Sequence, residues 1–105
     1  MEEKKEILQR IKKIIQEKEP EAHIYLYGSR ARGDEHNESD WDIMILLNKD
    51  VINFDVEKSI FSSLYDLELE IGEVISPLIY SENEWNTKYT VTPFYHIVMN
   101  EGYLI

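Results

Sequence analysis

The hydrophobic positions near the start of the chain repeat every three or four residues. Between residues 3 and 18 the repeat places five apolar side chains along one stripe of a helix, namely Ile7, Leu8, Ile11, Ile14 and Ile15. Such a stripe is typical of a helix that buries one face. Pro20 ends the pattern, because proline breaks a helix interior. We predict a helix over residues 3–18 that packs on the domain's own sheet rather than on a partner.

Three later segments have the composition of β-strands. His23–Tyr27 is rich in β-forming residues and ends abruptly at Gly28, which indicates a strand that enters a turn. Trp41–Leu47 is a nearly continuous apolar run, as expected of a strand buried on both faces. The third segment, Glu73–Tyr80, contains Pro77, which favours an edge position or a bulge.

Capping residues mark the remaining helices. A helical pattern over residues 55–69 follows Asn53 and Asp55, and either residue fits the N-cap. Ser81 opens a capping box before a short helix, and Thr92 precedes a last helix. The final three residues fit a short strand. This order of elements predicts an α+β fold in which helices cover a small mixed β-sheet.

Composition adds bounds to this picture. A chain of 105 residues fits a single domain over residues 1–105, and its 43% apolar content excludes a disordered or low-complexity chain. The absence of cysteine excludes disulfides, cysteine-ligated zinc and thiol chemistry. The formal net charge of −10 argues against non-specific binding to nucleic acids or to anionic membranes.

Targeting and membrane segments are not expected either. The charged N-terminus lacks the apolar core of a signal peptide, and the longest apolar runs fall far short of the roughly 20 residues that span a membrane. We therefore expect a soluble cytoplasmic protein.

The turn after the first predicted strand contains Gly28 and Ser29. A glycine lets the backbone approach a ligand closely, and the amides and hydroxyl that follow can hold phosphate oxygens. By itself, a Gly-Ser pair after a strand is most often an ordinary turn.

Two carboxylates stand at the head of the second predicted strand. Because side chains alternate along a strand, Asp40 and Asp42 share one face while Trp41 points to the other. Like charges this close are costly unless a cation neutralises them, and Mg²⁺ commonly joins one or two carboxylates to substrate phosphates. An isolated Asp-x-Asp pair is more often a solvated strand end. A neighbouring Gly-Ser turn changes that balance, since two adjacent strands then offer a phosphate cradle and metal ligands.

The motif consists of Gly28-Ser29 and Asp40-x-Asp42, separated by ten residues. It resembles the signature of the nucleotidyltransferase superfamily related to DNA polymerase beta. The fuller stretches Gly-Ser-Arg-Ala-Arg-Gly and Ser-Asp-Trp-Asp-Ile resemble its minimal nucleotidyltransferase (MNT) branch, of the MntA antitoxin type. This resemblance implies a polymerase beta-like fold and Mg²⁺-dependent transfer of a nucleoside monophosphate, such as AMP from ATP, to a hydroxyl. It also implies a HEPN-domain toxin as partner, whose tyrosine accepts the group.

The resemblance also implies roles for individual residues. Gly28 and Ser29 would hold the triphosphate, while Asp40 and Asp42 would bind the metal and act in catalysis. Arg30 and Arg32 are candidates to offset phosphate charge, with solvent-facing side chains as the alternative.

One position departs from the family pattern. The family supplies a third carboxylate from a later strand, and the hydrophobic run of the third strand puts Ser76 at that position. Glu73 is the nearest substitute, although strand alternation sets it on the opposite face unless Pro77 marks a bulge. Either Glu73 completes the site, or catalysis is weak and the protein neutralises its partner by binding alone. The sequence leaves a homo-oligomer open.

Overall fold

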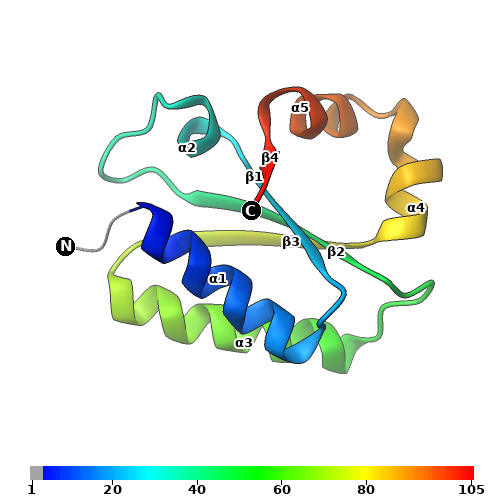
Figure 1. Ribbon diagram of the computed structural model, residues 1–105, viewed down its shortest axis with the longest axis horizontal. Coiled ribbons are helices and arrows are strands. Elements are labelled where there is room, and N and C mark those ends of the chain that lie inside the picture. The colour runs from blue at the N-terminus through cyan, green and yellow to red at the C-terminus, as the bar shows by residue number, and fades with distance from the viewer. Residues whose placement is uncertain (1–3) are drawn as a thin grey trace.

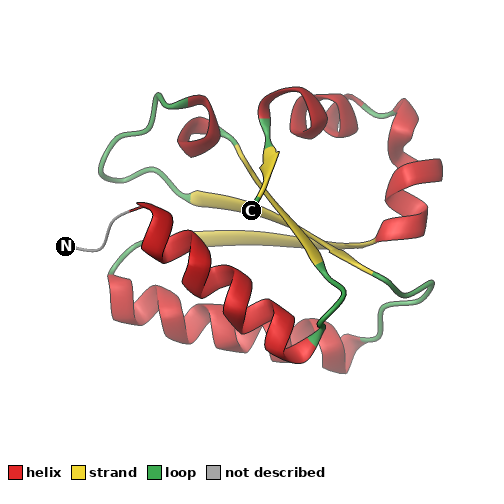
Figure 2. Ribbon diagram, viewed as in Figure 1, coloured by secondary structure: helices red, strands yellow, loops and turns green. Residues whose placement is uncertain are grey.

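The protein, seen here as a computed structural model that describes residues 4–105, alternates helices with the strands of one sheet (Figures 1 and 2). In chain order the elements are α1 (Lys4–Lys18), β1 (His23–Tyr27), α2 (Ser29–Arg32), β2 (Trp41–Leu47), α3 (Phe54–Ile71), β3 (Ile75–Ser81), α4 (Glu82–Thr87), the 3₁₀ helix η1 (Tyr89–Val91), α5 (Pro93–Glu101) and β4 (Tyr103–Leu104). The predicted start of the first helix, at residue 3, lies outside the described residues.

The four strands form a mixed sheet in the order β3-β2-β1-β4. β1 pairs antiparallel with both β2 and β4, whereas β2 and β3 run parallel and are joined through α3. Pro77 lies in β3, an edge strand, where a missing backbone donor is tolerated. The mixed sheet with its helices confirms the predicted α+β class.

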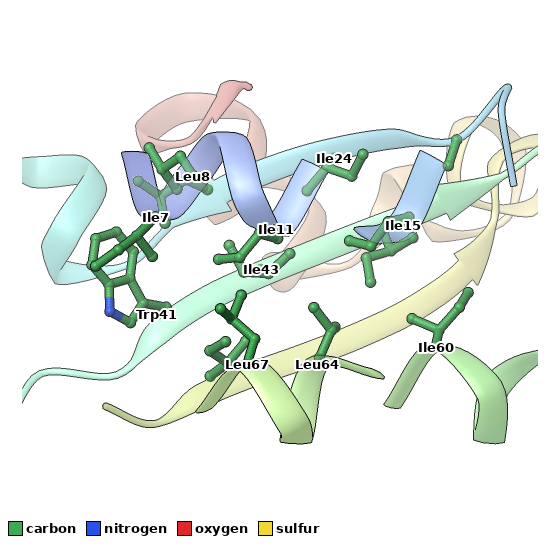
Figure 3. Close-up of a cluster of buried hydrophobic side chains, with 14 of the residues drawn as sticks. Ile7, Leu8, Ile11, Ile15, Ile24, Trp41, Ile43, Ile60, Leu64 and Leu67 are labelled. Carbon is green, nitrogen blue, oxygen red and sulfur yellow. The ribbon is translucent and has the colours of Figure 1, made fainter. Parts of the chain in front are cut away.

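One face of the sheet is covered by α1 and α3, which lie side by side below it in Figure 1. The alternate side chains of β2 that point to this face pack against the apolar stripes of both helices (Figure 3). Ile11 of α1, Ile43 of β2 and Ile60 of α3 are all fully buried there. The predicted stripe on the first helix therefore packs on the domain's own sheet.

The opposite face carries a second, aromatic core. Met44 and Leu46 of β2 pack with Trp85 of α4 and Val98 of α5. Tyr80 of β3 stacks near Trp85, with ring centroids 5.5 Å apart. This cluster fixes α5 over the sheet and so positions the C-terminal end of that helix near the end of β1.

Local sequence signals explain most element ends. The side chains of Asn53, Ser81 and Thr92 accept hydrogen bonds from backbone amides in the first turns of α3, α4 and α5. Gly72 ends α3 in the left-handed conformation, with φ of 71°.

The third strand begins later than predicted, at Ile75 instead of Glu73. The carbonyl of Val74 accepts a hydrogen bond from the Trp41 amide at 2.9 Å, just before the regular pairing of β3 with β2 starts. Within residues 4–105, none of the helices has the length and apolarity that crossing a membrane requires.

Candidate active site

The turn between β1 and α2 brings the backbone against a carboxylate of the next strand. Gly28 has φ of 77° and ψ of −160°, a conformation that is essentially restricted to glycine. A Cβ atom on Gly28 would lie 2.2 Å from Oδ2 of Asp42, so a side chain there would require the Asp42 carboxylate to move. The amides of Ala31 and Arg32 close the turn by donating to the Gly28 carbonyl. Geometry thus joins the two halves of the sequence motif.

Asp42 occupies the edge of the aromatic face of the sheet. It pairs with Tyr27 of β1 and Ser76 of β3, and it shares its face with Met44 and Leu46. Burial raises the pKa of Asp42, the negative charges of Asp40 and Glu101 raise it further, and the positive charge of Arg32 opposes them.

Asp40 lies beside Asp42 on the exposed side of the site. Oδ2 of Asp40 accepts a hydrogen bond from the Ser76 hydroxyl at 3.0 Å. The cross-strand register therefore puts Ser76 next to both aspartates, where the sequence analysis located it. A hydroxyl stands where the family resemblance implies a third acid.

The two aspartates suit a hard divalent cation. Within residues 4–105, no group of three or more histidine or acidic side chains is arranged to hold a metal ion. A cation bound by Asp40 and Asp42 would therefore take its remaining ligands from water or from substrate oxygens, which is how Mg²⁺ is commonly held. The raised pKa of Asp42 fits this chemistry, because a nearby cation would relieve the repulsion that raises it.

Tyr27 borders the same site at the end of β1. Burial, followed by the charge of Asp42, raises the pKa of Tyr27 to about 12. Its phenol therefore stays protonated at neutral pH.

Arg30 points away from the aspartates and into the protein. Its guanidinium donates to the Ser39 carbonyl at 2.7 and 3.1 Å and to Oε1 of Glu73 at 2.9 Å. It also lies 4.1 Å from the ring centroid of Trp41, which is a cation–π contact. Arg30 is only 7% exposed, so its charge supports the loop that carries Ser39 and Asp40.

Glu73 lies with Arg30 on the α1–α3 side of the sheet. Its Oε1 accepts hydrogen bonds from Arg30 and from the Trp41 indole, the latter at 3.2 Å. The structure therefore brings Glu73 together with Trp41, on the side of β2 opposite to Asp42. Strand alternation predicts this side for Glu73 if β3 has no bulge at Pro77.

Arg32 is exposed and reaches the site from the end of α2. Its Nη1 donates to both oxygens of Glu101 at 3.1 Å, and its Nε donates to Asp34 at 3.2 Å. These hydrogen bonds, with Glu101 first, raise the pKa of Arg32. Of the two candidate arginines, Arg32 is the one beside the aspartates.

Glu101 is a site residue that the sequence analysis did not identify. Its Oε1 also accepts a hydrogen bond from the Gly28 amide at 3.2 Å. It lies more than seventy residues from Gly28 in the chain, at the end of α5. Only the packing of α5 against the aromatic core brings it to the turn, so no local sequence signal marks it.

Comparison with known proteins gives a family and a fold. A family model described as polymerase beta, nucleotidyltransferase matches residues 9–100. Curated proteins give no match to this sequence.

Solved structures with the same fold include toxin–antitoxin complexes. One, described as a toxin-antitoxin with AMP-PNP, has a TM-score of 0.65 and 21% identity, covering 91% of this chain and 69% of that one. A first variant of the toxin–antitoxin MntA-HpeT has a TM-score of 0.64 and 18% identity, covering 91% and 69%. A second variant has a TM-score of 0.63 and 20% identity, covering 93% and 70%. At these identities the likeness establishes the fold.

Proposed function

The chain belongs to the polymerase beta nucleotidyltransferase family, and on that premise we propose that it transfers AMP from ATP to a hydroxyl group of a protein partner. In this reaction the hydroxyl oxygen forms a bond to the α-phosphorus. The bond from the α-phosphorus to the bridging oxygen breaks, pyrophosphate leaves, and the hydroxyl proton is released. The best-fitting acceptor is a tyrosine of a HEPN-domain toxin.

The observation that carries this proposal is the contact between Gly28 and Asp42. The glycine backbone is held in a conformation that only glycine adopts readily, directly against the carboxylate. This arrangement brings the Gly28-Ser29 turn close to Asp42, so that phosphate oxygens bound at the turn would lie within reach of that carboxylate.

Each residue has a separate task in the proposed site. Gly28 and Ser29 hold the triphosphate, and Arg32 offsets its charge. Asp40 and Asp42 would hold Mg²⁺, which when bound supplies positive charge between the carboxylates and the phosphates. Arg30 and Glu73, which contact each other and Trp41, support the loop from the other side of the sheet.

The proposed partner is supported by the solved structures of the same fold. Three of them are described as toxin–antitoxin complexes, and one of these contains AMP-PNP.

The test is label transfer from α-labelled ATP, in the presence of Mg²⁺, to the neighbour-encoded protein, which we propose to be the toxin. We expect label on the toxin with the wild-type protein and none with Asp42→Asn. Asp50→Asn, an exposed change of the same chemical kind, is the control and should transfer like wild type. Absence of transfer by the wild-type protein, or equal transfer by Asp42→Asn, would contradict the proposal.

A second function is favoured by one observation, the hydroxyl of Ser76 in place of a third carboxylate. In that case the protein neutralises the toxin by binding and covering it, with little or no catalysis. A double variant, Asp40→Ala with Asp42→Ala, separates the two functions in cells that express the toxin. Survival with the double variant favours binding alone, and death favours catalysis.

A further inference from the structure

Glu101 is an acidic side chain held by the backbone and the arginine of the proposed triphosphate site. Its Oε1 accepts from the Gly28 amide at 3.2 Å and from Nη1 of Arg32 at 3.1 Å, and its Oε2 accepts from the same nitrogen at 3.1 Å. Its side chain is 23% exposed. Both of these donors therefore already hold an anion in the protein alone.

The stability of α5 does not explain an acid at this place. Glu101 is the last residue of α5, and a helix C-terminus disfavours negative charge. The carboxylate also adds to the negative charge around Asp42 and helps to raise the pKa of that residue. The positive charge of Arg32 offsets these two costs, and the ion pair with Arg32 therefore explains why a carboxylate is tolerated at position 101.

The backbone at Glu101 is fixed, whereas its carboxylate is held only by its hydrogen bonds to Gly28 and Arg32. Gly102 follows it, and a Cβ there would lie 2.6 Å from the Val98 carbonyl and 2.8 Å from the Leu26 carbonyl. The next two residues pair with β1 as β4. A movement of the carboxylate away from Gly28 therefore requires only side-chain rotation at the edge of the site.

A carboxylate and a phosphate use the same donors in the same way, so the two anions compete for them. We propose that Glu101 is a resident anion of the triphosphate site, which the phosphates of an incoming nucleotide displace from Gly28 and Arg32. The inference rests on the proposed function for the identity of the ligand. Glu101 would then lower the affinity of the free protein for nucleotide, because it competes with the phosphates for the same donors.

Removing the charge of Glu101 should tighten phosphate binding. Glu101→Gln keeps the size of the side chain but loses the charge-assisted hydrogen bonds to Arg32 and Gly28. The phosphates then displace weaker hydrogen bonds when they bind. It also removes one negative charge from the path of the triphosphate. We expect a gain in affinity of about two- to fivefold, the size that suits a partly exposed ion pair.

The experiment is titration calorimetry with inorganic tripolyphosphate, and separately with AMP-PNP and Mg²⁺, on wild type, Glu101→Gln and Glu101→Ala. Glu38→Gln is the matched control, because it removes the same charge from an exposed position in the loop between α2 and β2. We expect tighter binding of both probes by the two Glu101 variants and unchanged binding by the control. A melting curve for each variant verifies that it is folded.

Three results would overturn the inference. Equal or weaker binding by folded Glu101 variants, with wild type binding normally, rejects the resident anion and leaves the proposed function intact. A loss of AMP transfer by Glu101→Gln at saturating nucleotide, with unchanged affinity, would place Glu101 at the reacting atoms instead. If neither probe binds wild type or variants, the proposed function and this inference both fail.

Discussion

The hydroxyl of Ser76 donates a hydrogen bond to Oδ2 of Asp40 over 3.0 Å. Ser76 is also the cross-strand partner of Asp42, so a single side chain of β3 lies beside both aspartates. The hydroxyl satisfies one carboxylate oxygen without adding charge to a site that already holds Asp40, Asp42 and Glu101. In the metal site that we propose, β3 therefore adds no carboxylate to Asp40 and Asp42, and a substitution of Ser76 could supply one.

Replacing Ser76 with aspartate should strengthen the metal site and weaken the metal-free protein. A third carboxylate beside Asp40 and Asp42 adds an oxygen ligand for Mg²⁺, but it repels both neighbours when no cation is present. We expect Ser76→Asp to melt at a lower temperature in EDTA and to gain more stability from Mg²⁺ than wild type does. Thermal melting with and without Mg²⁺ measures both effects. Ser76→Ala is the control, and an equal gain from Mg²⁺ in Ser76→Ala and Ser76→Asp would refute the prediction.

Gly28→Ala should lose both stability and nucleotide binding. The backbone conformation alone costs a non-glycine residue about 1–3 kcal/mol, and the new Cβ would meet Asp42. Gly33→Ala is a matched control, because Gly33 also has a positive φ, of 84°, but a Cβ there meets nothing within 4 Å. We expect Gly33→Ala to cost about 1 kcal/mol and to bind nucleotide normally. Melting curves and titration with AMP-PNP test the pair, and normal binding by Gly28→Ala would contradict the close approach.

The same substitution should lower stability at Arg30 and ligand affinity at Arg32. Arg30→Met removes the buried hydrogen bonds to Ser39 and Glu73, which should cost about 2 kcal/mol and lower the melting temperature by roughly 10 °C. Arg32→Met acts at an exposed position, so we expect little change in melting temperature but a loss of affinity for tripolyphosphate. Calorimetry on the two folded variants measures this. Stronger loss of affinity in Arg30→Met than in Arg32→Met would reverse the assignment.

Asp42→Asn should stabilise the metal-free protein at neutral pH. The pKa of Asp42 is raised in the folded protein by burial and by Asp40, so the folded state binds the proton more tightly than the unfolded state. Stability from this group is fully present below the unfolded pKa, near 3.8, and is lost as the pH rises through the folded pKa. Wild type therefore carries a penalty at pH 7 that the asparagine variant lacks.

The measurement is the melting temperature in EDTA between pH 3.5 and pH 7. We expect the melting temperature of Asp42→Asn to exceed that of wild type at pH 7. The difference should shrink as the pH falls through the folded pKa of Asp42, which lies above 3.8, and should be nearly absent at pH 3.5. Asp50→Asn, at an exposed position, should follow wild type. A lower melting temperature for Asp42→Asn at pH 7 would show that the carboxylate is stabilising without a metal.

Mg²⁺ and nucleotide should stabilise the protein together far more than either does alone. At a hundredfold excess over the dissociation constant, the bound pair should add about 2.7 kcal/mol. Nucleotide alone should add much less, because its phosphates face Asp40, Asp42 and Glu101 without a cation. Thermal melting with AMP-PNP, with and without Mg²⁺, measures the difference. Equal stabilisation in both conditions, or synergy that survives Asp42→Asn, would contradict a metal site at the aspartates.

The sequence predicts β1, β2 and the helix caps well because local signals decide them. The bounds of β1 and β2 agree with the predicted segments, since turns and an apolar run define both ends. The caps at Asn53, Ser81 and Thr92 are also confirmed, because a capping side chain bonds to an amide three residues away. The family match confirms the nucleotidyltransferase fold that the spacing of the motif implied.

Interactions across the fold explain what the sequence does not predict. Glu73 lies beside the start of β2. Its contacts with Arg30 and Trp41 depend on β3 beginning only at Ile75. Glu101 reaches Gly28 only because aromatic packing over the sheet positions α5. Neither the contacts of Glu73 nor those of Glu101 can be predicted from residue spacing within a short stretch of sequence.

The placement of the two tryptophans gives each layer of the protein its own fluorescent reporter. Trp41, 1% exposed, belongs to the core under α1 and α3, and Trp85, 0% exposed, belongs to the aromatic core under α4 and α5. They are the only tryptophans in the sequence, so Trp41→Phe and Trp85→Phe each leave one indole to observe. If the two single-tryptophan proteins lose their blue-shifted emission at the same denaturant concentration, the layers unfold as one cooperative unit. If the Trp85 signal is lost first, the aromatic layer that holds Glu101 against the Gly28 turn can open while the rest of the domain stays folded.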